Sequence, residues 1–262
     1  MPNSVKILVI GDIVGRGGRT KIIKNLSKIR EKYQADFIVA NGENATNGNG
    51  LNYKHYKELV NAGCDVITMG NHVFGNKEIY SYAKEANRLV IPCNIKNLDE
   101  CFNNNLEKTL EFCGKKIKVI NILGQSNIRL ESEHPFIKFR DIDDHESIYV
   151  VDYHAELTAE KNVFGYNLDG KASIMFGTHT HVQTADERIM PQGMAYISDV
   201  GMCGARESVI GFNYQEAVKG QWEGTPYSVE KRPPIMLNAM LVEIDLESRR
   251  AINILRINED LE

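Results

Sequence analysis

Hydrophobic residues in the first ninety positions alternate between short continuous runs and runs at helical spacing. The continuous runs predict buried strands, and a glycine follows each of the first three. The runs at helical spacing predict amphipathic helices, and Gly63 is placed to end the second of these. The predicted strands cover 5–10, 36–41, 66–69 and 89–92, and the predicted helices cover 22–33, 53–62 and 77–87. Such alternation is typical of a parallel sheet with right-handed crossovers.

The rest of the chain combines polar stretches with further apolar runs. Residues 93–113 are rich in asparagine, which predicts a surface loop leading into a hairpin, and 125–146 read as irregular. The predicted strands here are the hairpin pair 106–112 and 116–123, the buried runs 147–153 and 172–176, and an antiparallel pair at 236–244 and 251–257. Because no internal repeat or linker interrupts the pattern, we expect a single domain over 1–262, of the α/β class.

Composition and charge exclude several classes of protein. The 262 residues carry 31 basic and 35 acidic side chains, a formal charge of −4, whereas proteins that bind duplex nucleic acid usually carry a basic stripe. No apolar run reaches the roughly 18 residues of a membrane span, and the first residues lack the pattern of a signal peptide. Five scattered cysteines without a CxxC pair fit reduced thiols. We therefore expect a cytoplasmic protein that binds neither membranes nor duplex nucleic acid stably.

Side chains of the kind that bind metals gather where the predicted strands end. They follow five strands at their carboxyl ends, which is where open parallel sheets bind ligands. These residues are Asp12, Glu43, Asn44, Asn71, His72, His154, His179 and His181. Residues that are distant in the sequence are therefore predicted to meet at one edge of the sheet.

Taken singly, these residues have ordinary explanations. Asp12 would serve as a helix cap, Glu43 as part of a solvated turn, and His154 as a buried histidine with its own hydrogen bond. His179 and His181 are harder to explain in this way, because residues two apart on an extended segment point in the same direction. The other histidines, which we expect at the surface, are His55, His134 and His145.

The chemistry of this set points to transition metals. Oxygen and imidazole ligands without a thiolate suit manganese, iron, zinc, cobalt or nickel better than calcium or magnesium. Seven ligands exceed the needs of one structural zinc ion, but with a bridging carboxylate they suit two metals about 3.5–4 Å apart, which promote displacement at phosphorus. Other motifs are weaker. The glycine-rich segment 15–20 fails the P-loop and GxGxxG spacings, which weakens a nicotinamide-binding hypothesis, and Cys203 is interpreted as a small buried residue.

Six stretches of the chain resemble the calcineurin-like metallophosphoesterases, and more closely their bacterial YmdB-type branch of cyclic-nucleotide phosphodiesterases. The stretches are Ile10–Gly15, Asn41–Ala45, Thr68–Val73, Val151–Glu156, Gly177–Thr184 and Ser198–Gly204. The resemblance spans nearly the whole chain. It implies a four-layer α+β sandwich with central mixed sheets flanked by helices. It also implies two divalent or transition metal ions, with iron or manganese favoured and zinc as a further candidate.

The resemblance assigns roles to the individual residues. Asp12 and His181 would hold one metal, with Asn44 as a nearby ligand. The second metal would be held by Asn71, His154 and His179, and Glu43 would bridge the two. His72 would be no ligand but the catalytic proton donor to the leaving oxygen.

The chain departs from the pattern of the wider superfamily in four places. Val14 stands where the superfamily has a histidine ligand, and Glu43 replaces the usual bridging aspartate; the YmdB-type branch shares both changes. Gly75 follows His72 at a position where an acidic residue often orients the histidine. Segment 125–147 is shorter than in that branch, which changes one wall of the expected pocket.

These observations lead to a functional hypothesis and two competitors. The hypothesis is hydrolysis of a small cyclic nucleotide, foremost a 2′,3′-cyclic monophosphate, by a hydroxide bridging two metals, with His72 protonating the ribose oxygen. One competitor is a broader phosphomonoesterase or RNA-end nuclease at the same site. The other is a regulatory protein that binds metal and nucleotide without turnover. Apolar segments near the C-terminus suggest self-association into a homo-oligomer.

Overall fold

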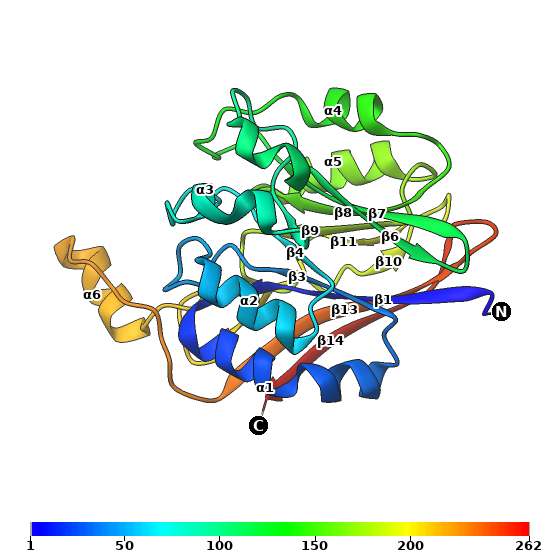
Figure 1. Ribbon diagram of the computed structural model, residues 1–262. Helices are drawn as coiled ribbons and strands as arrows, with labels where there is room; N and C mark the ends of the chain where they lie inside the picture. Colours follow the sequence, from blue (N-terminus) through cyan, green and yellow to red (C-terminus); the bar gives the residue numbers. More distant parts are fainter. Residues whose placement is uncertain (1, 262) are drawn as a thin grey trace.

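Two β-sheets packed face to face form the centre of the molecule, and helices cover the outer face of each sheet (Figure 1). The computed structural model describes residues 2–261. The layers follow one another as helix, sheet, sheet, helix, with one apolar core between the sheets and one between each sheet and its helices. The expected class, mixed α/β with central sheets flanked by helices, is confirmed.

The first sheet has eight strands and is mixed. Its strand order is β2-β12-β13-β1-β3-β4-β5, and β14 pairs with β13. The strands are β1 (Ser4–Ile10), β2 (Asp12–Ile13), β3 (Phe37–Asn41), β4 (Val66–Thr68), β5 (Leu89–Val90), β12 (Met202–Ala205), β13 (Ile235–Asp245) and β14 (Ala251–Leu261). Strands β1, β3, β4 and β5 are parallel to their neighbours in this group, as the sequence predicts, whereas β13 is antiparallel to β1, β12 and β14.

The second sheet has six strands in the order β10-β11-β9-β8-β7-β6. The strands are β6 (Glu107–Phe112), β7 (Lys115–Leu123), β8 (Ile148–His154), β9 (Ile174–Thr178), β10 (Arg188–Ile189) and β11 (Ala195–Ile197). Its four central strands are parallel, and the two edge strands are antiparallel to their neighbours. The predicted hairpin is the β6–β7 pair.

Burial on both faces explains why the central strands read as continuous apolar runs. In β1, Val5, Ile7 and Val9 face the core between the sheets, while Leu8 and Ile10 face the helices of the first sheet. Neighbouring residues of a strand point to opposite faces, so a strand covered on both sides is apolar at every position.

Helices occupy three settings in the fold. Those of the first sheet are α1 (Gly15–Tyr33), α2 (Tyr53–Ala62), α3 (Ile79–Tyr82), η1 (Ala83–Glu85) and η2 (Glu100–Asn105), those of the second are α4 (Pro135–Ile142) and α5 (Thr158–Leu168), and α6 (Tyr214–Glu223) stands apart. Helix α2 has the predicted bounds, because the Asn52 side chain caps its start and Gly63 ends it with a φ of 117°.

Three predictions about helices were wrong in extent. Helix α1 begins at Gly15, seven residues before the predicted start. Its glycines permit a close approach to β12, because a Cβ at Gly18 would overlap the backbone oxygen of Cys203. The helix predicted over 77–87 is only α3 followed by η1. The segment read as irregular, 125–146, contains α4, which begins at Pro135.

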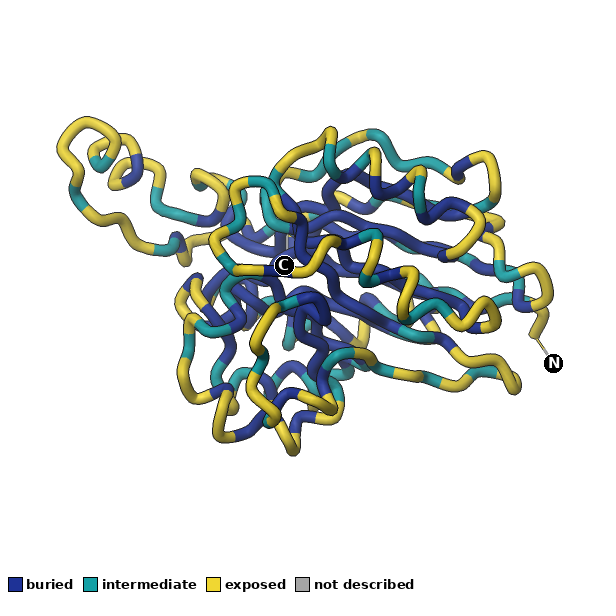
Figure 2. Tube along the Cα trace, turned by 90° about the horizontal axis from the view of Figure 1, so that it is seen from above, coloured by how far each residue is buried: buried dark blue, intermediate teal, exposed yellow. Residues whose placement is uncertain are grey.

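Helix α6 lies on an arm that projects from the body of the molecule (Figure 2). Tyr214, Val218 and Trp222 follow one another at intervals of four residues, and all three are exposed, Trp222 to 87%. The base of the arm contacts the body of the molecule, where the backbone oxygen of Ile210 lies 2.8 Å from Nδ1 of His181. Within residues 2–261, no helix combines the length and the apolar character that a membrane crossing would require.

Candidate metal centre

All eight residues singled out in the sequence lie at the carboxyl ends of strands, and the two sheets bring them together. Asp12 follows β1, Glu43 and Asn44 follow β3, and Asn71 and His72 follow β4, all in the first sheet. His154 ends β8, and His179 and His181 follow β9, both in the second sheet. The predicted cluster is therefore assembled across the two sheets rather than along one edge.

One half of the cluster centres on His154. Its Nε2 lies 2.8 Å from Oδ1 of Asn71, 3.1 Å from Nδ1 of His179 and 3.3 Å from Oε1 of Glu43. The candidate ligand atoms of Glu43, His154 and His179 lie within 4.8 Å of one another. One carboxylate oxygen and two imidazole nitrogens converging in this way suit a divalent transition metal.

The other half centres on Asp12 and His181. Nε2 of His181 lies 3.5 Å from Oδ1 of Asp12, and the amide nitrogen of Asn44 lies 3.0 Å from that Nε2 and 3.2 Å from the Asp12 oxygen. Asp12 is fully buried and His181 is 9% exposed. Here the amide nitrogen of Asn44, not its oxygen, faces the other two side chains, so a half-turn of the amide would be needed before Asn44 could act as a ligand.

Glu43 lies between the two halves. Its Oε1 is 3.3 Å from His154 in one half and 3.2 Å from the amide nitrogen of Asn44 in the other. Its second oxygen, Oε2, accepts a hydrogen bond of 3.0 Å from the backbone nitrogen of His72. A carboxylate in this position contacts both halves with one buried side chain.

His72 stands at the rim of the cluster rather than inside it. Its side chain is 42% exposed, and its Nδ1 lies 2.8 Å from Oδ1 of Asn44 and 3.5 Å from Oε1 of Glu43. Nε2 is therefore the ring nitrogen left available to another molecule. Such a histidine can exchange a proton with a bound ligand without being a member of the buried group.

The buried charges shift one another's pKa values. Burial opposes ionisation of Asp12, yet the adjoining His181 holds the pKa of that carboxyl well below its usual range. Burial lowers the pKa of His181, but Asp12 more than offsets this and raises it to about 9. In the other half, burial together with the charge of His154 lowers the pKa of His179 to about 4. His179 and His181 thus differ in how readily a proton competes for the imidazole nitrogen, and Glu43 raises the pKa of His154 despite its burial.

A buried carboxylate supports His154 from behind. Nδ1 of His154 lies 2.8 Å from the hydroxyl of Thr178, and that hydroxyl donates a 2.6 Å hydrogen bond to Asp152. Asp152 also accepts hydrogen bonds from Thr68 and Asn41 on the first sheet, and burial raises its pKa to about 7. No supporting role was predicted for Asp152 from the sequence, although an aspartate inside an otherwise apolar strand was a visible signal.

A buried ion pair holds the loop that carries His179 and His181. Nζ of Lys161 on α5 lies 2.7 Å from Oδ2 of Asp199 and donates to the backbone oxygen of Thr178 at 2.9 Å. The same Asp199 oxygen accepts hydrogen bonds from the backbone nitrogen and the hydroxyl of Thr180, at 3.1 Å and 2.8 Å. Lys161 is fully buried. No periodicity or motif marks Lys161, so sequence reasoning missed it.

The backbone of this loop corrects one sequence argument. His179 and His181 have φ values of 98° and 64°, so they occupy the left-handed region and not an extended segment. They reach different halves of the cluster instead of pointing the same way. Non-glycine residues in this region are strained and persist only where the surroundings hold them, which the Lys161–Asp199 pair does here.

The backbone also makes room for the side chains. A Cβ at Gly70, the residue before Asn71, would overlap the Glu43 carboxylate and the His154 ring. Glycine has no Cβ and therefore leaves these two groups in place. Its position in the GNH stretch is therefore explained by close approach.

Burial bears on the remaining sequence expectations, and His55 departs from its expected place at the surface. His134 and His145 are exposed, whereas His55 is half-buried with Nδ1 2.8 Å from the hydroxyl of Thr46. Cys203 is fully buried, and burial raises the pKa of its thiol, which does not favour a nucleophile. The described residues contain no disulfide, and Cys64, Cys93, Cys101, Cys113 and Cys203 are free.

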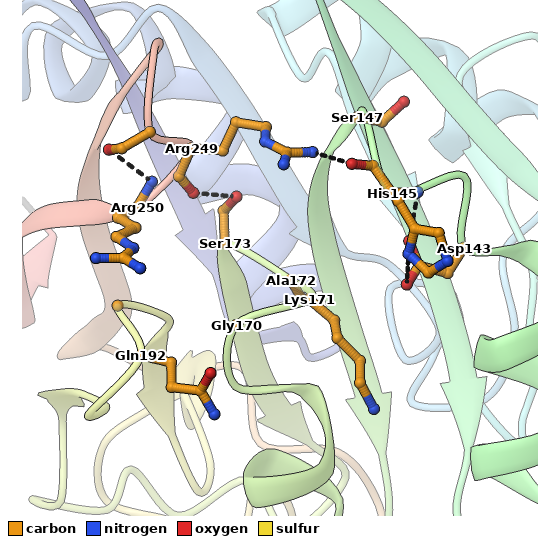
Figure 3. A pocket seen from close by; sticks show the side chains of 12 residues that line it. Asp143, His145, Ser147, Gly170, Lys171, Ala172, Ser173, Gln192, Arg249 and Arg250 are labelled. Carbon is orange, nitrogen blue, oxygen red and sulfur yellow. Dashed lines mark hydrogen bonds and ion pairs between the residues drawn. The ribbon is translucent and has the colours of Figure 1, made fainter.

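Two hollows of the surface lie far apart in the fold. One of about 390 Å³ is lined by Asn71, His72 and residues 127–130, beside the cluster. Another of about 280 Å³ lies at the opposite ends of β8 and β9 and contains none of the predicted ligands (Figure 3). There Arg249 donates to the backbone oxygen of His145 and accepts at its own backbone oxygen from Ser173. These bonds tie the β13–β14 turn to the second sheet.

Comparison with known proteins decides the family. A model of the YmdB-like protein family matches residues 8–257, which is nearly the whole chain. The chain belongs to the YmdB-like family. It is 37% identical to the 2′,3′-cyclic-nucleotide 2′-phosphodiesterase of Bacillus subtilis, with 98% of each chain covered.

Solved structures agree with this assignment. A phosphatase from Mycoplasma pneumoniae superimposes on the chain with a TM-score of 0.92 and 37% identity, covering 99% of this chain and 95% of the other. NAD nucleotidase of Haemophilus influenzae shares the fold alone, with a TM-score of 0.57, 13% identity and coverage of 98% and 56%. The resemblance to the YmdB-type metallophosphoesterases and the expectation of a phosphoesterase enzyme are confirmed.

Proposed function

We propose that this YmdB-like protein is a phosphodiesterase that uses two divalent metals to hydrolyse small cyclic nucleotides, 2′,3′-cyclic monophosphates foremost. The observation that carries the proposal is the position of Glu43, whose one buried carboxylate contacts both halves of an oxygen and imidazole cluster. The similarity to the Bacillus subtilis phosphodiesterase supports the substrate class. The five free cysteines support a cytoplasmic location, where thiols are kept reduced.

The residues present fit two transition metals. Glu43 with His154, His179 and Asn71 would hold one, and Asp12 with His181 and Asn44 would hold the other, with Glu43 shared. Iron and manganese are the metals that the family resemblance favours, and an oxygen and imidazole set also accepts zinc. When bound, two such metals neutralise charge on the phosphate and lower the pKa of a water molecule for in-line attack.

The chain's own contribution to the reaction is the proton at His72. Nε2 of this half-exposed ring is available to the leaving ribose oxygen, because Nδ1 is occupied by Asn44. With Nδ1 donating to the Asn44 oxygen, the protonated ring carries its second proton on Nε2 and becomes neutral when it gives that proton to the ribose oxygen.

One experiment tests the proposal directly. Metal content per chain is measured on freshly purified protein, and turnover of bis-p-nitrophenyl phosphate and of 2′,3′-cyclic AMP is assayed on the same sample. We expect about two transition metals per chain together with cleavage of both diesters. A p-nitrophenyl monoester and a short RNA serve as comparison substrates, and faster cleavage of either would favour the phosphomonoesterase or RNA-end nuclease. Absence of metal and of activity after addition of manganese or iron would overturn the proposal.

A further inference from the structure

A second hollow adjoins the one beside His72. The hollow beside His72 is lined in part by residues 127–130, and the second, of about 260 Å³, is lined by Lys96 and by residues of the segment 125–132. Ile128, Arg129 and Leu130 line both hollows, so the two lie next to each other. A ligand reacting beside His72 therefore has a neighbouring space into which the rest of the molecule can extend.

The segment that lines both hollows is held at its two ends. Before it, the backbone nitrogens of Gln125 and Ser126 donate to the Glu160 carboxylate at 2.7 Å and 3.4 Å. After it, the backbone nitrogen of Lys96 donates to the oxygen of Glu131 at 3.0 Å, and Asn94 is hydrogen-bonded to Glu133 in both directions. Residues 127–130 are thus a short, anchored stretch, and the hollows are preformed.

The second hollow carries an excess of positive charge without internal partners. Among the described residues, neither Lys96 nor Arg129 has a side-chain hydrogen bond or an ion pair, whereas the nearby Lys138 is neutralised by Glu133 at 3.3 Å. Glu131 supplies the one carboxylate of the lining. Arg129 is exposed, and Ile128 and Leu130 beside it are half-buried apolar walls. Two unpaired cations beside apolar surface are suited to a nucleotide that carries a phosphate.

We propose that this second hollow is a subsite for a phosphate on the 5′ oxygen of the reacting nucleotide, with Arg129 as its principal contact and Lys96 as its second. The proposal rests on the proposed function, because the cyclic phosphate is placed beside His72 and its metal cluster. The substrate class becomes a nucleoside 2′,3′-cyclic phosphate that bears a 5′ phosphate. That phosphate is either a terminal monoester or the linkage to the preceding nucleotide of an RNA fragment.

Three substrates separate the possibilities: adenosine 2′,3′-cyclic phosphate with a free 5′ hydroxyl, the same compound with a 5′ phosphate, and the dinucleotide ApA ending in a 2′,3′-cyclic phosphate. kcat and KM are measured for each at one fixed ionic strength, since phosphate contacts depend on salt. We expect kcat/KM to be about 10- to 100-fold higher for a substrate with a 5′ phosphate, mainly through KM. The comparison of monoester with dinucleotide identifies the source of the phosphate.

Variants assign the effect to the subsite. Arg129→Gln should reduce the preference for a 5′ phosphate toward one, and Lys96→Gln should reduce it less. Arg140→Gln is the matched control, because Arg140 lies exposed on α4 beside Asp141, outside both hollows, and should keep the full preference.

Two results would overturn the inference while leaving the proposed function intact: equal kcat/KM with and without the 5′ phosphate, or a loss in Arg129→Gln that is the same for all three substrates. Hydrolysis of bis-p-nitrophenyl phosphate in the same preparations shows that the centre itself is active. If no diester is cleaved by the metal-loaded protein, the proposed function fails, and the subsite fails with it.

Discussion

Removal of the Lys161 charge tests whether the buried ion pair holds the metal-binding loop in place. In Lys161→Met the side chain keeps a similar length, but Asp199 loses a partner at 2.7 Å and the backbone oxygen of Thr178 loses a donor at 2.9 Å. Lys161 is fully buried and Asp199 is 1% exposed. A lone charge is therefore left where water does not reach it.

The expected cost follows from this burial. Breaking a buried pair by removal of one partner costs about 3–5 kcal/mol, because the remaining charge stays desolvated. For a chain of this size, that corresponds to a fall in melting temperature of roughly 6–20 °C. Asp199 keeps its hydrogen bonds to Thr180 but loses the positive charge that holds its carboxylate in place. The strained backbone at His179 and His181 can then relax. Because both histidines are candidate ligands, we expect the affinity for metal to fall by about 10- to 100-fold.

The assay needs both states of the protein, because bound metal stabilises the fold by mass action. Urea unfolding of metal-free protein measures the free energy of unfolding, and titration with manganese measures affinity. Lys32→Met is the matched control: Lys32 and Glu259 lie 2.6 Å apart, but their side chains are 56% and 37% exposed. Exposed pairs contribute about 0–1 kcal/mol. The double variant Lys161→Met/Asp199→Asn should lose less than the sum of the single losses.

If metal-free Lys161→Met were destabilised no more than Lys32→Met, the buried ion pair would not stabilise the fold as expected. A loss of stability with unchanged manganese affinity would refute only the second step, since the pair would then support the core and not the loop. Both measurements use the same protein samples.

The remaining predictions concern the cluster. His72→Ala should retain metal and lose about 10²–10⁴-fold in kcat, whereas Glu43→Ala should lose metal, and equal metal content in the two variants would contradict their assigned roles. Metal needs a neutral imidazole, and the pKa of His181 is about 9 without metal, so calorimetric metal affinity should rise about tenfold per pH unit up to pH 9. The same raised pKa stabilises the metal-free fold below pH 6.5 and ceases to do so as the pH rises through 9, a change absent from His181→Gln. Gly70→Ala should lower metal content and stability, because the added methyl group overlaps Glu43 and His154; normal metal content would refute that contact.

The strands were predictable from the sequence because covered sheets impose a simple pattern. A run such as Val5–Ile10 is apolar at every position, since both of its faces are buried. Residues that end helices were also recognisable in the sequence, since α2 has the predicted bounds and ends at Gly63. The short and edge elements were not, because β2, β10 and β12 have only two to four residues and depend on partners distant in the chain.

The residues of the candidate site were easier to foresee than their supports. Ligand-type side chains at strand ends share a position that the sequence displays, and the structure does bring them together. The supporting contacts, Asp152 through Thr178 and Lys161 with Asp199, join residues on different elements, and nothing in the local sequence announces the partner. The positive φ of His179 has the same origin, because tertiary contacts and not local preference determine it.

The position of the chain's single tryptophan decides how this protein can be observed. Trp222 lies on the projecting arm and is 87% exposed, so its indole is in contact with water in the native state as it would be in an unfolded chain. Tryptophan emission should therefore change little when the protein unfolds. Unfolding is better followed by far-UV circular dichroism, which reports the backbone. For the same reason, the indole reports changes in the arm without interference from the core. A change in its emission when a nucleotide is added would signal an event at the arm, whose base contacts His181.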